Sequence, residues 1–256
     1  MISKKNKELS HDLEVSLKII EDLGFCLDAN SVILDFGCGS GEFVKELNEH
    51  GYNAFGCDIK IDSEQDEIKK GRIRAIDINP YRLPFEDNTF DFIYSFSVFE
   101  HVQNYFESIS ELARVLKPNG ICYHFFPARY RIIEPHTYVP LSTVIRSYNW
   151  LYIWSLMRIR NEFQEGMSVK EIAIKNQKYL RNHTNYLSRH KLNEYFKNHF
   201  NNVIFGERHF LKYLRRVNYL YNLSAAIPLI PNIYGSFRSN IIITRSPKSG
   251  VEPPPL

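Results

Sequence analysis

The chain has 256 residues, of which 44% are hydrophobic, 24% charged and 14% aromatic. This composition excludes a disordered polypeptide and is typical of a globular protein with one large α/β domain and insertions. The net charge of +3 conceals an asymmetry, because residues 1–128 hold 13 Lys and Arg against 22 Asp and Glu, whereas residues 129–256 hold 19 against 7. A basic second half favours an anionic partner, although basic side chains that only solvate surface helices are an equal alternative.

The cysteines and the polarity of two segments of the chain predict the cellular location of the protein. The four cysteines form no CxxC pair, and no histidines accompany them at metal-ligand spacing, so we expect reduced thiols and no metal site. Residues 1–7 are polar, which argues against a signal peptide. The apolar segment 217–233 is interrupted by prolines and asparagines and is too broken to span a bilayer. We therefore expect a cytoplasmic protein, with peripheral contact at the inner face of the membrane as an alternative.

Helical and strand patterns alternate through the first half of the chain. Leucine and isoleucine spacing predicts a helix over 13–23, and further helices are expected over 42–50 and between 106 and 117, where Pro118-Asn119-Gly120 would end the last one. Short apolar runs predict strands over 31–36, 53–57, 72–76, 90–96 and 121–126. This alternation indicates an α/β fold, a doubly wound (Rossmann-like), mostly parallel, seven-stranded sheet with helices on both faces. Residues 1–126 would form its cofactor-binding half.

The alternation is lost over residues 127–187, which are rich in Tyr, Trp and Arg. We expect a mixed, mainly helical cap insertion here, lying over the ligand edge of the sheet, although aromatic side chains at helical spacing can also simply pack a small core. Sheet elements return over 188–210 and 239–245, with a helix over 188–198 and strands over 203–209 and 240–244. A second insertion would occupy 211–238. The proline-rich tail 246–256 is expected to be disordered.

A glycine-rich turn joins the first strand to the next helix. It reads Asp35-Phe36-Gly37-Cys38-Gly39-Ser40-Gly41-Glu42, and its glycines would let a ligand approach the backbone at the helix N-terminus. Glu42 stands where a dinucleotide fingerprint needs its third glycine, and its carboxylate would repel a pyrophosphate. A ligand with an ammonium group and no phosphate suits this turn better, which predicts S-adenosylmethionine as the cofactor.

Two further acidic residues are expected at neighbouring strand ends. Asp58 follows the second strand, about 20 residues after the glycines, where a carboxylate binds ribose hydroxyls in folds of this kind. Asp77 is expected to end the third strand, where it could accept an adenine amino proton beside the apolar wall of Ile78. Taken singly, each could instead be an ordinary turn residue.

Five motifs follow one another in order between residues 30 and 126. They are Asp77-Ile78-Asn79, Leu83-Pro84-Phe85 with Asp87, Phe90-Asp91-Phe92-Ile93, Glu100-His101-Val102, and Leu116-Lys117-Pro118-Asn119-Gly120. This succession resembles class I S-adenosylmethionine-dependent methyltransferases of the type that includes the ubiquinone-biosynthesis enzymes. The resemblance implies that the cofactor is bound by Asp35, Phe36, Gly37, Gly39, Gly41, Asp58, Ile59, Asp77, Ile78, Ser95 and Phe96. One departure is the short, polar connection between Asp58 and Arg72, which puts the second crossover helix in doubt.

Methyl transfer to a hydroxyl needs a base, and histidine is the usual one. Three histidines are expected near the site: His101 after the fourth strand, His124 on the fifth and His136 in the cap. We expect His124 in the core, and favour a structural role for His101 while keeping it as a catalytic candidate. His136 is our candidate base, with Glu134 orienting it. The stretch Glu134-Pro135-His136 is also similar to the cap of methyltransferases encoded with bacterial surface-polysaccharide pathways, which implies a sugar hydroxyl as acceptor.

The arginines of the cap point to the acceptor, because Arg is rarely buried without an anionic partner. We expect Arg129, Arg131, Tyr130 and Tyr138 to bind an anionic sugar or lipid-linked glycan. Alternatives are a lipid or quinone methyltransferase that contacts the membrane through 217–234, an RNA methyltransferase, and a non-catalytic binding protein. Scattered basic residues argue against nucleic acid, and the intact glycine turn argues against a non-catalytic protein. The oligomeric state is left open.

Overall fold

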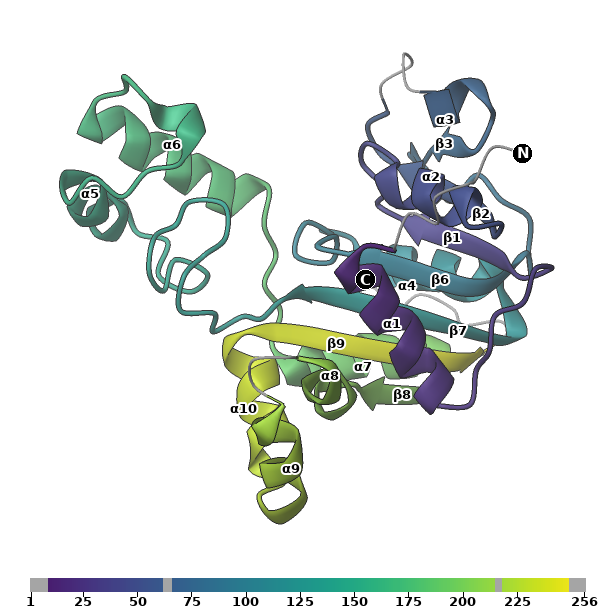
Figure 1. The fold of residues 1–256 in the computed structure, drawn as a ribbon. Helices are drawn as coiled ribbons and strands as arrows, with labels where there is room; N and C mark the ends of the chain where they lie inside the picture. The colour runs from purple at the N-terminus through teal and green to yellow at the C-terminus, as the bar shows by residue number, and fades with distance from the viewer. Residues whose placement is uncertain (1–8, 62–65, 215–217, 249–256) are drawn as a thin grey trace, which may run out of the picture.

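A single seven-stranded sheet organises the computed structural model, which describes residues 9–61, 66–214 and 218–248 (Figure 1). Its order in this part of the chain is β3-β2-β1-β6-β7-β9-β8. The strands are β1 Val32–Phe36, β2 Asn53–Asp58, β3 Ile73–Ala75, β6 Phe90–Phe96, β7 Leu116–Pro127, β8 Phe200–Phe205 and β9 Ser239–Pro247. Neighbours from β3 to β7 run parallel, whereas β9 is antiparallel to both β7 and β8. The predicted doubly wound, mostly parallel seven-stranded sheet is confirmed.

Helices cover both faces of this sheet because side chains alternate along each strand. On β1, Ile33 packs in the layer with α1 and α2, and Leu34 packs in the opposite layer with α4 and α7. The helices outside the cap are α1 His11–Asp22, α2 Glu42–Glu49, α3 Asp66–Lys69, α4 Tyr105–Val115, α7 Arg189–His199, α8 Glu207–Tyr213, α9 Tyr219–Ala226 and α10 Leu229–Phe237. The second crossover helix, α3, has only four residues, in keeping with the short connection noted in the sequence.

Strand boundaries differ from prediction around β3 and β7. The strand β3 ends at Ala75, so Asp77 does not end it; Asp77 instead lies in a small antiparallel sheet of β4 (Asp77–Ile78) and β5 (Tyr81–Arg82) that the sequence did not predict. The helix α4 ends at Val115, and Pro118-Asn119-Gly120 belongs to β7. The strand can start this early because its first residue, Leu116, pairs with Phe90 beside a bulge.

The last strands are also shifted from their predicted ranges. The strand β8 covers Phe200–Phe205 instead of 203–209, because a helix, α8, begins at Glu207 and carries Phe210 and Leu211 into the core. The final strand β9 continues to Pro247, paired with Phe200, so the expected disordered tail is wrong at residues 246 and 247. The remainder of that tail, 249–256, lies outside the described residues.

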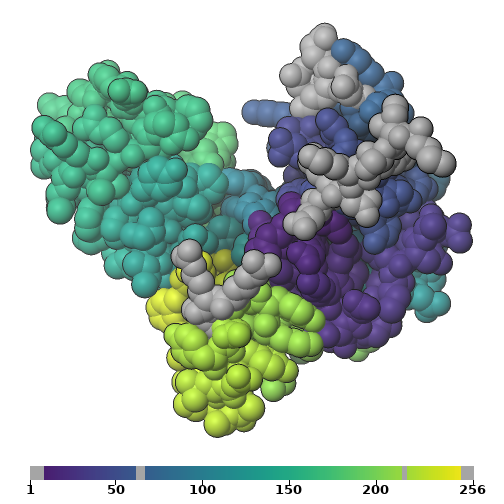
Figure 2. Space-filling view, viewed as in Figure 1, coloured from purple at the N-terminus to yellow at the C-terminus, as the bar shows by residue number. Residues whose placement is uncertain are grey.

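The cap extends from the carboxyl end of β7 and consists of α5 Tyr148–Leu156, the short 3-10 helix η1 Glu162–Gln164 and α6 Val169–Asn182 (Figure 1). Val139, Leu151, Ala173 and Leu180 form its own small core, which Tyr148, Trp150, Tyr152 and Trp154 surround. The aromatic residues of the cap therefore pack that core, as the simpler interpretation of the sequence expected. In the space-filling view an open notch separates the cap from the half of the molecule that contains β1 and α2 (Figure 2).

The second insertion is a pair of short helices, α9 and α10, below β9 in Figure 1. Val217, the first residue of the apolar segment singled out in the sequence, lies outside the described residues. None of the helices in the described ranges has the length and apolarity that a membrane span requires.

Candidate active site

The glycine turn between β1 and α2 has the backbone geometry that its composition predicts. Gly37, Gly39 and Gly41 have φ angles of +76°, +49° and +75°, in the left-handed region that other residues rarely adopt. A Cβ atom on Gly37 would stand 2.4 Å from Cγ2 of Val98, and one on Gly41 would stand 2.2 Å from Cδ1 of Ile73. Only glycine fits at these two positions.

Two carboxylates lie beside this turn. Asp58, the last residue of β2, accepts a hydrogen bond of 2.9 Å from the Gly39 amide. Asp35 is 2% exposed, and its Oδ2 atom has no hydrogen-bond partner among the described residues. Burial, and then the charge of Asp58, raises the pKa of Asp35 to about 7. A buried carboxylate oxygen without a partner is costly, so this edge suits a ligand that brings an ammonium group.

The other predicted cofactor residues are spread around the same edge. Ile59 and Ile78 are 60% and 71% exposed, and Asp77 is exposed beside Ile78, so an apolar wall with an acceptor is accessible there. Phe36 is buried against Phe99, which leaves only its backbone to face a ligand. Their contacts with a cofactor stay predictions.

The Ser95 side chain is engaged within the protein and is not exposed at this edge of the sheet. Its hydroxyl is buried and lies 2.8 Å from Nδ1 of His124. His124 lies in the core between Phe99 and Phe196, as expected, and burial lowers its pKa to about 3. Phe96 stacks on Phe125 at 4.8 Å. The roles predicted for Ser95 and Phe96 beneath the sulfonium stay predictions.

The predicted pair in the cap is formed. Glu134 is fully buried, and its Oε1 lies 2.7 Å from Nδ1 of His136. The same carboxylate accepts hydrogen bonds from the amide and hydroxyl of Thr137 at 2.7 and 2.8 Å and from the hydroxyl of Tyr186 at 2.7 Å. Glu134 is therefore held rigidly and fixes the orientation of the His136 ring.

Ionisation of the pair follows from these contacts. Burial opposes the charge on Glu134, but hydrogen bonds from His136, Tyr186 and Thr137 outweigh it and leave the pKa of Glu134 lowered. Burial likewise lowers the pKa of His136, yet the hydrogen bond and charge of Glu134 outweigh it and leave that pKa raised. An ionised Glu134 can only accept, so Nδ1 of His136 donates to it and Nε2 is the atom left for chemistry.

The third catalytic candidate lies against this pair. The rings of His101 and His136 are 4.9 Å apart, and Nδ1 of His101 donates to the carbonyl of His183 over 2.7 Å. The His101 amide donates to the carbonyl of Val98, the residue that packs on Gly37. The three catalytic candidates, Glu134, His136 and His101, therefore form one cluster. Val98 connects this cluster to the glycine turn.

Sequence reasoning missed two members of this cluster. Glu100 was noted only as part of a motif, and the structure buries it beside both histidines. Tyr186 carried no local signal, because it reaches Glu134 from 52 residues downstream.

The predicted acceptor residues are only partly brought together. Arg129 donates to the carbonyl of Tyr186, and Arg131 donates to the carbonyls of Ile133 and Arg238. Carbonyl oxygens therefore satisfy part of each guanidinium, so the expectation that these arginines need an anion is weakened. Tyr138 is 45% exposed, with a left-handed backbone.

A cavity of about 60 Å³ joins two of these residues to the end of the sheet. Arg129 and Tyr130 line it together with Arg189 and Asn240. The Asn240 side chain is 1% exposed, and neither its nitrogen nor its oxygen has a partner among the described residues. A polar ligand group in this cavity would satisfy that amide.

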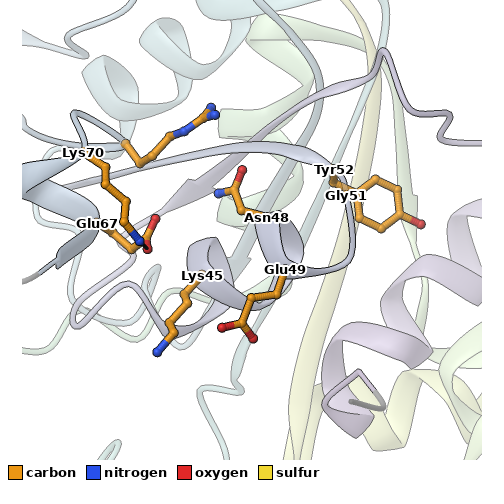
Figure 3. Close-up of a pocket in the computed structure, with 8 residues that line it drawn as sticks. Lys45, Asn48, Glu49, Gly51, Tyr52, Glu67 and Lys70 are labelled. Atoms are coloured by element: carbon orange, nitrogen blue, oxygen red, sulfur yellow. Dashed lines mark hydrogen bonds and ion pairs between the residues drawn. The ribbon is translucent and has the colours of Figure 1, made fainter. Parts of the chain in front are cut away.

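A larger hollow of about 470 Å³ lies elsewhere (Figure 3). It is lined by α2, by Gly51 and Tyr52, and by Glu67 of α3, which is ion-paired at 2.7 Å with Lys70, the residue after that helix. None of its lining residues belongs to the glycine turn or to the Glu134–His136 pair, so it is not the candidate active site.

Comparison with protein families shows which family carries this turn and these strand ends. Residues 34–124 match the family described as a methyltransferase domain. These residues are similar to that family. The matched segment runs from β1 to His124 on β7, so it includes the glycine turn and Glu100–His101. The cap with Glu134 and His136 lies outside it.

Curated relatives match about a third of this chain, between 35% and 37% in three examples. A sterol 4-C-methyltransferase of Caenorhabditis elegans is 29% identical over 101 residues, which are 37% of this chain and 30% of that protein. A demethylmenaquinone methyltransferase of Shouchella clausii is 29% identical over 104 residues, which are 37% of this chain and 44% of that protein. An uncharacterised protein of Methanocaldococcus jannaschii is 37% identical over 90 residues, 35% of this chain and 37% of that one. The matches thus span less than half the length of each relative.

Solved structures extend the likeness to the whole fold. An S-adenosylmethionine-dependent methyltransferase from Mesorhizobium loti has a TM-score of 0.51 and 12% sequence identity, and the match covers 92% of this chain and 100% of that one. The chain therefore shares the α/β, Rossmann-like fold of that protein.

Proposed function

We propose that this chain is an S-adenosylmethionine-dependent methyltransferase that methylates a hydroxyl group of an anionic sugar or a lipid-linked glycan. The observation that carries the proposal is the Glu134–His136 pair, with Nδ1 of the histidine 2.7 Å from a buried carboxylate, joined through His101 and Val98 to the glycine turn of a methyltransferase domain. The buried Oδ2 of Asp35, which has no partner in the described part of the chain, supports the cofactor, because S-adenosylmethionine carries an ammonium group and no phosphate. The Mesorhizobium loti protein of the same fold is named as dependent on that compound.

The residues divide the reaction between them. Asp35, Asp58 and the glycine turn would hold S-adenosylmethionine, which would supply an electrophilic methyl group whose bonding electron pair stays on sulfur. His136 takes the hydroxyl proton on Nε2, and Glu134 stabilises the imidazolium that results. The fixed orientation of the pair aligns the acceptor for in-line attack, and alignment of this kind contributes about 7–11 kcal/mol to the lowering of a barrier.

Two features support an anionic acceptor. Arg129 uses one N–H in its bond to Tyr186, and a guanidinium has five, so donors remain for a carboxylate or phosphate. Asn240 also lines the cavity beside Arg129, and its amide has no partner within the described ranges. Both groups lie at the sheet edge where the cap begins.

The surface of α9 and α10 favours the lipid-linked form of the acceptor. Six side chains on these helices and their connection are each at least 44% exposed: Tyr219, Leu223, Ile227, Leu229, Ile233 and Phe237. We call them the α9–α10 face. Tyr130 of the cap packs beside Phe237 with ring centroids 6.2 Å apart, so the face continues toward the cap. No Asp or Glu occurs between Arg208 and Lys248, which suits an anionic membrane surface.

Calorimetry tests the cofactor, and labelled methyl transfer tests the chemistry. Purified protein should give a heat of binding with S-adenosylhomocysteine and no heat of binding with NADH. Binding of NADH without binding of S-adenosylhomocysteine contradicts the proposal.

Transfer of radiolabelled methyl groups into cell-envelope fractions should fall by about 10²- to 10⁴-fold in His136→Asn, because a general base contributes about that much. Cofactor affinity should be unchanged in this variant. His209→Asn, a half-buried histidine on α8, is the matched control and should transfer methyl groups like the unmodified protein.

A further inference from the structure

Three potential metal ligands meet where two distant segments of the chain touch. Glu100 and His101 follow β6, and His136 comes from the cap; their ligand atoms all lie within 4.8 Å of one another. The sequence predicted no metal site, because its cysteines form no CxxC pair and no histidines accompany them at metal-ligand spacing. The cluster arises only when the cap folds back on the loop after β6.

Both histidines make the hydrogen bond that commonly supports a metal-binding histidine. Nδ1 of His101 donates to the carbonyl of His183, and Nδ1 of His136 donates to the carboxylate of Glu134, each over 2.7 Å. In a neutral imidazole whose Nδ1 carries the proton, Nε2 presents a lone pair. A carboxylate or carbonyl behind the ring is the usual support of a metal-binding histidine, since it sets the tautomer and raises the basicity of the ligand.

Glu100 adds an independent observation. Its side chain is 1% exposed, and neither carboxylate oxygen has a hydrogen-bond partner among the described residues. A buried carboxylate with no partner requires a proton or a cation beside it, and the ligand atoms grouped with it are the nitrogens of two histidines.

We propose that Glu100, His101 and His136 bind one divalent transition-metal cation, of which Zn²⁺ is the best match. Two imidazoles and one carboxylate form a donor set that Zn²⁺ prefers, and three protein ligands leave a fourth position open, as in catalytic zinc sites. Glu134 and the carbonyl of His183 serve as the outer supports. Mg²⁺ and Ca²⁺ fit less well because they prefer oxygen ligands.

The cation site itself does not depend on methyl transfer; only its use in the reaction rests on the function proposed above. A hydroxyl bound at the open position would lose its proton to solvent more readily, because a bound cation lowers the pKa of a coordinated O–H group. The cation then takes over the task that His136 performs in the metal-free protein, since the same Nε2 lone pair serves either a proton or a metal.

Metal binding can be measured without cofactor or acceptor. The chain, free of any histidine tag, is stripped with a chelator and titrated with Zn²⁺ alone, and bound zinc is counted by mass spectrometry after gel filtration. We expect one zinc per chain. Glu100→Gln and His136→Asn should lose it, and Glu134→Gln should weaken it by about 10- to 100-fold, as loss of an outer support does. His209→Asn should bind like the unmodified protein.

A second measurement uses the unmodified chain, in case a variant does not fold. In ¹⁵N-histidine NMR, Zn²⁺ should shift the Nε2 resonances of two histidines and leave the others in place. No bound zinc, or zinc bound equally by Glu100→Gln and His136→Asn, overturns the inference and leaves the proposed function standing. Zinc bound without any affinity for S-adenosylhomocysteine supports the inference and contradicts the proposed function.

Discussion

Gly37 shows how a single backbone position limits the whole site. Gly24 has nearly the same backbone, with φ of +77° against +76°, but a Cβ atom on Gly24 would have nothing within 4 Å, whereas one on Gly37 would collide with Val98. A left-handed backbone costs an L-residue about 1–2 kcal/mol, and overpacking adds about 1–3 kcal/mol. The turn therefore tolerates no side chain at Gly37 for two separable reasons.

Alanine substitution should separate the two costs. Urea unfolding of Gly24→Ala should show only the backbone cost, and that of Gly37→Ala should show a loss larger by about 1–3 kcal/mol. Only Gly37→Ala should also weaken binding of S-adenosylhomocysteine, because Val98 must move beside the cofactor edge. Equal losses of stability in the two variants would mean that the contact with Val98 is easily relieved.

Asp35 couples cofactor binding to pH. Its pKa is about 7 in the folded chain against an ordinary value of 3.8, so its contribution to stability is fully present below pH 3.8 and is lost as pH rises through 7. Asp35→Asn should therefore be more stable than the unmodified chain at pH 8, by on the order of 4 kcal/mol at about 1.4 kcal/mol per pKa unit, and the difference should vanish near pH 4.

The same substitution should harm binding. The ionised carboxylate is the form that pairs with an ammonium group, so affinity for S-adenosylhomocysteine should rise from pH 6 to pH 8 in the unmodified chain and stay flat and weak in Asp35→Asn. Thermal melts and calorimetry at three pH values measure both effects. Asp28 is the control, because hydrogen bonds from Ser31 and Asn30 lower its pKa, and Asp28→Asn should gain no stability at pH 8.

Among the elements, the α9–α10 hairpin has the clearest unexplained surface. Its exposed apolar side chains lie between Arg208 on α8 and Arg238 at the end of α10, so apolar and basic groups are presented together. Such a surface binds an anionic membrane by apolar burial and by charge. It would place the cap edge close to a lipid-linked acceptor.

Vesicle sedimentation tests this element. The protein should sediment with vesicles of phosphatidylcholine and phosphatidylglycerol more than with phosphatidylcholine alone, and less at high salt. Leu229→Glu should reduce binding by at least about 10-fold, because burial of one leucine side chain is worth about 1.5–3 kcal/mol. Phe163→Glu changes a 75% exposed side chain on η1, outside the α9–α10 face, and should have no effect. Equal loss in both variants, or no binding by the unmodified chain, would refute the membrane contact.

Across the whole molecule, the sequence predicts those features of the fold and of the site that residues close together in the chain determine. The strand Phe90–Phe96 has the predicted bounds because a buried parallel strand is a largely apolar run. The Glu134–His136 contact could be predicted because the two residues are only two positions apart in the sequence. Glu207 starts a helix instead of extending β8, and its buried carboxylate pairs with Arg189, 18 residues away, which no local pattern reveals. The place of Glu100 in the cluster likewise depends on the return of the cap, where the Asn185 amide bonds to the Glu100 carbonyl.

The position of β9 between β7 and β8 has a consequence for synthesis on the ribosome. The edge of β7 that pairs with β9 stays unpaired until the cap, α7, β8 and the α9–α10 hairpin have all been translated. At about 5–20 residues per second, the 111 intervening positions, 128–238, take roughly 6–22 s. During that interval the nascent chain exposes an unpaired strand edge, the kind of surface on which chaperones act and from which aggregation starts.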